Sequence, residues 1–250
     1  MTEFSANLGF LWAELPLPKA IHAAAHAGFD AVECHWPYDT PASETKAALK
    51  AAGLPMLGLN TARGAPGENG LAALPGREAE ARAAIDRVLG YADETGTKSV
   101  HVMAGIALGQ AAHDCFLGNL DYACEQAEAL GITILIEPLN GYDAPGYFLH
   151  DVDQALDIIK SVNRANLKLM FDCYHVQIIH GDLTRQLTKC LPHIGHIQFA
   201  SVPDRGPPDH GEINYAHIFG HIRALGYAAP LGAEYKPRGK TETTLNWMQI

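Results

Sequence analysis

A short apolar run that ends at a carboxylate constrains the fold more than any other feature of this sequence. Residues 132–140 read Ile-Thr-Ile-Leu-Ile-Glu-Pro-Leu-Asn, a β-branched and aliphatic stretch between Gly131 and Pro138. An unbroken run of this kind is typical of a strand that is buried on both faces, as in a parallel sheet. The carboxylate at its end, Glu137, is costly to bury unless something positive lies close to it.

The same pattern occurs three more times downstream. Apolar runs over 167–171, 194–197 and 230–233 end at Asp172, Gln198 and Glu234. Their spacing of about 25 to 35 residues is the length of a βα unit. Four further strands are expected over 4–10, 29–34, 55–59 and 99–103, each followed by a helical stretch. Eight such units in 250 residues predict an α/β fold, a single-domain (β/α)₈ TIM barrel spanning residues 1–250.

Composition excludes several classes of protein. The net charge of −10 disfavours a nucleic-acid partner, which is usually bound through clustered Lys and Arg. The sequence has no apolar run of 18 residues and its first residues do not resemble a signal peptide, so we expect no membrane association and a cytoplasmic location. Five cysteines without a CxxC motif are consistent with reduced thiols.

The carboxyl ends of the strands are where (β/α)₈ barrels place their active sites. Glu137, Asp172, Gln198 and Glu234 would converge there. Each of them alone could be a helix N-cap or a surface residue, but four at matching strand ends indicate a site. Three carboxylates at the same end of a barrel repel each other, and a divalent cation is the simplest group that holds them together. An all-oxygen set of ligands favours Mg²⁺ or Mn²⁺ over a structural zinc.

Four further residues are candidates for contacts with a small-molecule substrate. They are His175, Arg205, His101 and Asn60. The alternatives are that His175 bonds to backbone, that His101 is a core histidine, and that Arg205 is a solvated loop residue. Residues 61–76 are rich in Gly, Pro and Ala and form the longest irregular stretch, and a loop of this length is usually functional or mobile.

Several motifs resemble the hydroxypyruvate isomerase family. They are Gly-Phe-Asp-Ala-Val-Glu at 28–33, Ala-Leu-Pro-Gly-Arg-Glu at 73–78, Ile-Glu-Pro-Leu-Asn at 136–140, Asp-x-Tyr-His-x-Gln at 172–177, Ile-Gly-His-Ile-Gln at 194–198 and Gly-Glu-Ile-Asn-Tyr at 211–215. This family belongs to a wider xylose isomerase-like group that includes 2-oxo-tetronate isomerases and ketose 3-epimerases. The resemblance implies a metal held by the four strand-end residues, with Glu137 and Glu234 as the acid/base pair. It also implies a short keto acid or a sugar as substrate and a homo-oligomer, commonly a dimer.

One departure from the family pattern concerns the substrate. The family commonly has Thr-Arg-Asp where this chain has Gly141-Tyr142-Asp143, so a substrate carboxylate needs another arginine, either Arg63 or Arg205. Two alternatives therefore accompany the prediction of a keto-acid isomerase. One is a ketose 3-epimerase or sugar isomerase that acts on a neutral substrate, and the remote one is an endonuclease IV-like metal-dependent nuclease.

Overall fold

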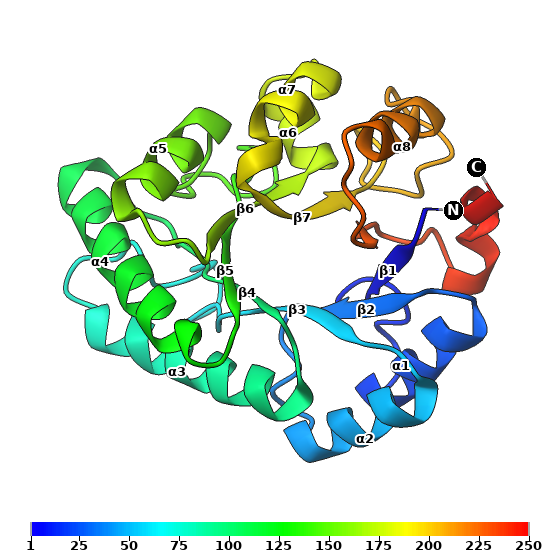
Figure 1. Cartoon of the computed structure of the whole chain (residues 1–250), viewed down its shortest axis with the longest axis horizontal. Helices are drawn as coiled ribbons and strands as arrows, with labels where there is room; N and C mark the ends of the chain where they lie inside the picture. The colour runs from blue at the N-terminus through cyan, green and yellow to red at the C-terminus, as the bar shows by residue number, and fades with distance from the viewer. Residues whose placement is uncertain (1, 250) are drawn as a thin grey trace.

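The computed structural model describes residues 2–249, and these form a closed barrel of eight parallel strands. Each strand pairs with the next along the chain, and β8 returns to pair with β1. The helices lie around the outside of the barrel (Figure 1). No helix within the described part of the chain is both long and apolar enough to cross a membrane. The predicted (β/α)₈ barrel is confirmed.

The strands are short and almost completely buried. They are β1 (Phe4–Asn7), β2 (Ala31–Cys34), β3 (Met56–Asn60), β4 (Ser99–His101), β5 (Thr133–Ile136), β6 (Leu167–Asp172), β7 (Ile194–Phe199) and β8 (Leu231–Ala233). Each lies within one of the predicted apolar runs or extends it by one or two residues. Strand β1 is shorter than predicted because the chain turns after Asn7, whose carbonyl accepts from the backbone N–H groups of Phe10 and Leu11.

The outer layer consists of helices that present a small apolar face to the sheet. They are α1 (Leu17–His26), α2 (Ala42–Ala52), α3 (Glu78–Thr95), α4 (Gly109–Glu128), α5 (Val152–Val162), α6 (Cys173–Ile179), α7 (Leu183–Cys190) and α8 (Tyr215–Ala224). Asp151 is the N-cap of α5, since its carboxylate accepts from the Gln154 backbone N–H.

Helix α6 was missing from the sequence prediction. It starts directly after β6, and the side chain of Asp172 accepts from the Tyr174 backbone N–H at 2.9 Å to cap it. Because no turn residue separates strand from helix, periodicity alone does not reveal the boundary. Two 3₁₀ turns, η2 (Thr241–Thr244) and η3 (Asn246–Gln249), follow β8, while residue 250 lies outside the described range.

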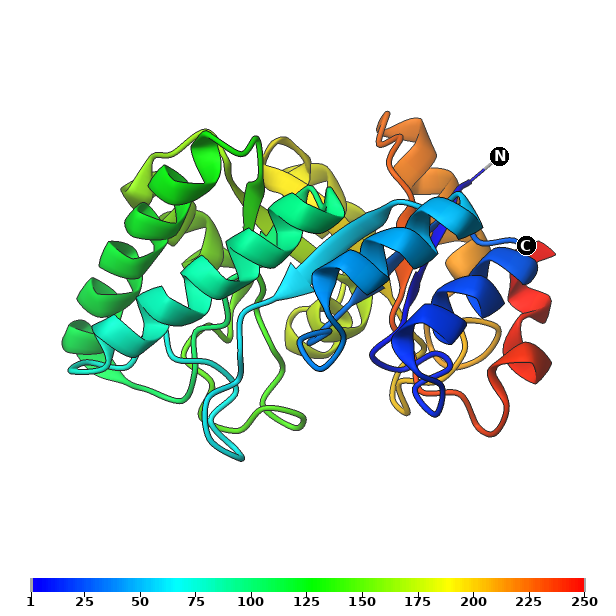
Figure 2. The same cartoon turned by 90° about the horizontal axis from the view of Figure 1, so that it is seen from below.

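The long loops gather at one end of the barrel, which Figure 2 shows at the lower edge of the molecule. The loop over 61–76 is irregular, as predicted, and is tied to the barrel by backbone bonds. Gly70 (φ +120°) forms an isolated bridge with Ala104, and a Cβ atom at Gly70 would lie 2.4 Å from the Met103 carbonyl oxygen. Only glycine fits this close approach. Arg77 adds ion pairs to Glu68 (2.5 Å) and Glu80 (2.7 Å).

The seam between the first and last strands is sealed by an aromatic cluster. Trp247, 1% exposed, packs edge-on against Phe4 of β1 and Phe199 of β7, with ring centroids 5.0 and 5.3 Å apart. Its indole N–H donates to the Tyr235 hydroxyl at 3.2 Å. Trp247 therefore covers the outer side of β1 and β7 next to the end of the chain.

We expect the Trp247→Ala substitution to lower the free energy of unfolding by about 3–5 kcal/mol, because it removes a fully buried indole and leaves a cavity. Denaturant titration would measure this loss. The Trp247→Phe variant keeps an aromatic ring in the cluster and should lose clearly less. A loss below about 1 kcal/mol in the alanine variant would contradict the sealing role.

Candidate active site

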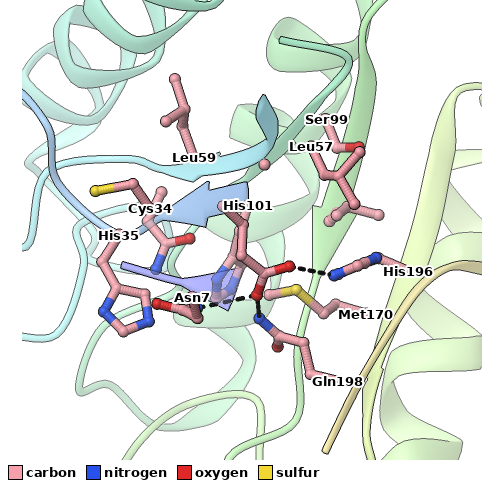
Figure 3. A pocket seen from close by; sticks show the side chains of 14 residues that line it. Asn7, Cys34, His35, Leu57, Leu59, Ser99, His101, Met170, His196 and Gln198 are labelled. Carbon is pink, nitrogen blue, oxygen red and sulfur yellow. Dashed lines mark hydrogen bonds and ion pairs between the residues drawn. The ribbon is translucent and has the colours of Figure 1, made fainter. Parts of the chain in front are cut away.

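A cavity of about 300 Å³ opens at the carboxyl ends of the strands, and we call it the mouth cavity. Its volume lies in the range of small-molecule sites. Six of the eight predicted site residues line it, namely Asn60, His101, Glu137, His175, Arg205 and Glu234. The other two, Asp172 and Gln198, are register partners in the neighbouring strands β6 and β7. Gln198 lines an adjoining pocket inside the barrel that shares His35, Asn60 and His101 with the mouth cavity (Figure 3).

Glu234 is surrounded by hydrogen-bond donors. It follows β8 and is 5% exposed. His35 donates to its Oε1 from Nε2 at 2.6 Å, and Asn7 donates to the same oxygen at 3.1 Å. Arg205 donates to its Oε2 and also lies 3.5 Å from Oδ2 of Asp172. The guanidinium of Arg205 thus links two of the predicted metal ligands.

Glu137 and Asp172 have no comparable set of donors. Both are buried, and in each case loss of solvent is the main reason that the pKa rises. The neighbouring Glu234 and Asp172 charges add to the effect and hold the pKa of Glu137 well above its usual value. The pKa of Asp172 is raised to about 8, with Arg205 offsetting part of the effect of burial.

The opposite shift occurs at Glu234. Burial acts to raise the pKa of this carboxyl, but Arg205 and His35 outweigh burial and hold the pKa well below the usual range. Arg205 and His35 therefore favour the ionised form of Glu234, whereas burial disfavours the ionised form of Glu137. Two carboxyls whose pKa values are displaced in opposite directions are the arrangement that acid/base chemistry requires.

Three buried oxygens in this region have no hydrogen-bond partner among residues 2–249. They are Oε1 of Glu137, Oδ2 of Asp172 and Oε1 of Gln198. An unsatisfied buried oxygen costs free energy, so each needs a partner that the protein itself does not provide. All three belong to the predicted ligand set, and oxygens of this kind are the ligands that Mg²⁺ and Mn²⁺ prefer. The residues present therefore fit a divalent cation.

The orientation of Gln198 is set by a buried carboxylate on β2. Glu33 accepts hydrogen bonds from Nε2 of Gln198 (2.6 Å), Nε2 of His196 (2.7 Å) and Nδ2 of Asn7 (3.0 Å). Because the amide nitrogen of Gln198 is bound to Glu33, the amide oxygen is the atom left for a cation. Figure 3 shows Asn7, His196 and Gln198 around this point, with the hydrogen bonds dashed.

His175 is close enough to the acids to be considered a metal ligand, but its hydrogen bonds indicate another role. One ligand atom each from Glu137, Asp172 and His175 lie within 4.8 Å of one another. However, the backbone N–H of Asn140 donates to Nδ1 of His175 at 3.1 Å. A neutral imidazole that accepts at Nδ1 carries its proton on Nε2, which then has no lone pair for a metal. Burial keeps the ring neutral by lowering its pKa well below the usual value.

The proton on Nε2 of His175 is available to a ligand. Nε2 lies 3.7 Å from Oδ2 of Asp172 and 4.0 Å from Oε1 of Glu137, too far for a hydrogen bond to either. His101 is a second neutral donor, because burial lowers its pKa to about 3. Neither of its ring nitrogens has a partner within the described chain, and Nδ1 lies 3.6 Å from Oε2 of Glu137. A satisfied core histidine, the alternative for His101, is therefore not what the structure contains.

Sequence reasoning missed three residues that support this site. They are His35, Asn7 and His196, which bind Glu234 or Glu33 from other strands of the barrel. Asn7 and His196 lie within strands β1 and β7, and His35 directly follows β2. Polar residues inside apolar runs were the available signal. Asn60, in contrast, lines the mouth cavity as predicted, and its backbone carbonyl accepts from the Tyr38 hydroxyl.

Comparison with known proteins identifies the family to which this barrel belongs. A family model described as "Xylose isomerase-like TIM barrel" matches residues 21–250. The chain belongs to the xylose isomerase-like TIM barrel family. Within this family, a 2-oxo-tetronate isomerase from Cupriavidus necator is 46% identical over 255 residues, covering 100% of this chain and 98% of that protein.

Two further relatives of the xylose isomerase-like barrel are informative. The hydroxypyruvate isomerase of Escherichia coli is 38% identical, covering 99% of this chain and 98% of that protein. A crystal structure described as an AP endonuclease of family 2 from Brucella melitensis superimposes with a TM-score of 0.96 at 41% identity, covering 100% and 98% of the two chains. The resemblance to the hydroxypyruvate isomerase family is thus confirmed over the full length.

We expect Mn²⁺ to raise the melting temperature more at pH 8 than at pH 6. A raised pKa means that Asp172 holds a proton at pH 6, which the cation must displace, whereas at pH 8 and above this carboxyl is increasingly ionised. When Mn²⁺ is present at about a hundredfold excess over its Kd, the free energy of unfolding should rise by about 3 kcal/mol, which raises the melting temperature by about 6–12 °C. Thermal unfolding with and without Mn²⁺ would measure the shift.

The control for this prediction is the Asp172→Asn variant. It keeps an oxygen that can cap α6 but lacks the titrating carboxyl. We expect it to lose most of the Mn²⁺-induced shift, because one carboxylate ligand is replaced by a neutral amide. An equal Mn²⁺ effect at both pH values in the unmodified protein would count against the acid cluster as the metal site.

Proposed function

We propose that this protein isomerises a short 2-keto hydroxy acid, of the hydroxypyruvate or 2-oxo-tetronate type, by a metal-dependent proton transfer between neighbouring carbons. The observation that carries the proposal is the pair of buried glutamates, Glu137 and Glu234, that line one small cavity beside buried oxygens without a hydrogen-bond partner in the described chain. Full-length relatives that are named as isomerases of such acids support it.

Glu137, Asp172, Gln198 and Glu234 would hold Mg²⁺ or Mn²⁺. When bound, the cation would polarise a carbonyl of the substrate and make the neighbouring C–H more acidic. Three of these residues offer an oxygen that accepts no hydrogen bond within the part of the chain that is described, which supports the assignment.

Glu234, which Arg205 and His35 keep ionised, would take the proton from the hydroxyl-bearing carbon. The electron pair of that C–H bond would form the double bond of an enediolate, and the former carbonyl oxygen would gain the hydroxyl proton. Glu234, or Glu137 after receiving that proton, would then deliver it to the former carbonyl carbon, which completes the exchange of the carbonyl and hydroxyl positions and returns both glutamates to their starting state. Burial of both carboxyls keeps bulk water from competing for these protons.

His175, His101, Asn60 and Arg205 would contact the substrate. His175 supports this role best, because its Nε2–H is fixed by the Asn140 hydrogen bond and faces the acids without bonding to them. Hydrogen bonds to substrate oxygens would orient the two reacting carbons between the glutamates.

A nuclease reaction is the weaker alternative. The Brucella structure is described as an AP endonuclease, and endonuclease IV-type enzymes share this barrel. A DNA backbone would meet a chain with a net charge of −10 and a mouth cavity whose carboxylates outnumber its arginines. Both features favour a small molecule over a polyanion.

We expect the Glu137→Gln and Glu234→Gln variants each to lose about a hundredfold or more of turnover while remaining folded. Deuterium uptake from D₂O in the presence of Mn²⁺ or Mg²⁺, followed by NMR, would measure turnover. The panel comprises hydroxypyruvate, 2-oxo-tetronates and neutral ketoses.

A matched control is Glu94→Gln, which changes an exposed glutamate on α3 and should keep the original rate. Failure of the unmodified protein to exchange protons into any keto acid would refute the proposed function. Exchange confined to neutral ketoses would replace it with a sugar isomerase or epimerase reaction. A glutamate variant with a rate near that of the unmodified protein would remove that residue from the acid/base pair.

A further inference from the structure

The mouth cavity contains few positive charges for a site that would take an anion. Two arginines line it, Arg63 and Arg205, and no lysine is among its described lining residues. Arg205 already faces Glu234, Asp172 and Asp143, the last two at 3.5 Å. Its charge is therefore matched by acids of the protein, and a substrate carboxylate would have to compete with them.

Arg63 is in a different situation. Its Cζ lies over the ring of Trp36, 4.2 Å from the ring centroid, and its guanidinium forms no ion pair with any residue in the range 2–249. Stacking occupies the face of a guanidinium and leaves its N–H edges free. Those edges are the part that binds a carboxylate through two parallel hydrogen bonds.

Trp36 is itself held in place, so the stacked arginine has a defined support. Its indole N–H donates to the backbone carbonyl of Thr61 at 3.0 Å, and its ring packs against His35 at 5.0 Å between centroids. His35 in turn donates to Glu234. A continuous set of contacts thus connects Arg63 to one of the two glutamates proposed to move the proton.

The backbone that carries Arg63 is also fixed. The Arg63 carbonyl accepts from the Gly70 N–H at 2.8 Å. Gly70 in turn packs closely against Met103, which follows β4. The ion pairs of Arg77 with Glu68 and Glu80 brace the same loop. Arg63 is therefore presented to the cavity by an ordered loop, which reduces the entropy lost on binding.

We propose that Arg63 binds the carboxylate of the substrate and is the residue that makes the site prefer 2-keto acids to neutral ketoses. This inference rests on the proposed function and adds to it the residue that selects the substrate class. A neutral ketose carries a hydroxymethyl group in place of the carboxylate and gains little from an arginine, whereas a carboxylate in a cavity lined by acids needs one.

The test compares substrates that differ only at this group. Hydroxypyruvate is matched with dihydroxyacetone, and a 2-oxo-tetronate with erythrulose. Steady-state proton exchange with Mn²⁺ would be measured for the unmodified protein and for Arg63→Gln and Arg63→Lys. Arg185→Gln, at an exposed arginine on α7, is the control.

We expect Arg63→Gln to lower kcat/KM for the acids about 10- to 100-fold, mainly by raising KM. The same substitution should change kcat/KM for the neutral ketoses by less than about threefold. On the acids, kcat/KM of the Arg63→Lys variant should lie between that of the unmodified protein and that of Arg63→Gln, since lysine keeps the charge but loses the paired hydrogen bonds. Equal losses on acids and ketoses, or no loss on acids, would overturn the assignment of Arg63 and leave the proposed function intact. An unmodified protein inactive on both acids would overturn both.

Discussion

The charge balance around Arg205 is the constraint on which the rest of the site depends. Four strand ends bring Glu137, Asp172, Gln198 and Glu234 into one buried region, and their carboxylates repel each other at close range. Arg205 reduces this repulsion at Glu234 and Asp172 but leaves Glu137 without an ion pair to an arginine or lysine within the described chain. Burial therefore raises the pKa of Glu137, while Arg205 and His35 hold the pKa of Glu234 below its usual range. Arg205 reaches this position with φ +52°, an uncommon backbone conformation for a side-chain-bearing residue.

A second layer of buried polar residues determines which atoms of the acid cluster are left for a ligand. Glu33 binds the amide nitrogen of Gln198, and Asn140 binds Nδ1 of His175. These two contacts decide that Gln198 offers an oxygen and that His175 offers a proton. Residues that never touch a substrate thus set the chemical character of those that would.

Much of the fold and of the candidate site could be predicted because both follow from strand periodicity. Buried parallel strands are continuous apolar runs, and their carboxyl ends meet at one edge, so Glu137, Asp172, Gln198 and Glu234 could be placed together from sequence alone. What could not be predicted depends on side-chain orientation across the barrel. His35, which follows β2, contacts Glu234 across a sequence separation of 199 residues, and no local pattern encodes that contact. The tautomer of His175 depends on the backbone N–H of Asn140, 35 positions away. Helix α6 was missed because its N-cap, Asp172, is also the last residue of a strand.

The pairing of β1 with β8 has a consequence for biosynthesis. The first strand emerges from the ribosome long before its partner exists, and both of its neighbours in the finished barrel must be present before its hydrogen-bonding edges are covered. The aromatic seal of Trp247 against Phe4 forms later still, since that residue follows β8. A nascent chain of this protein therefore carries an open sheet edge throughout most of its translation, which makes chaperone engagement most valuable in the interval before β8 is released.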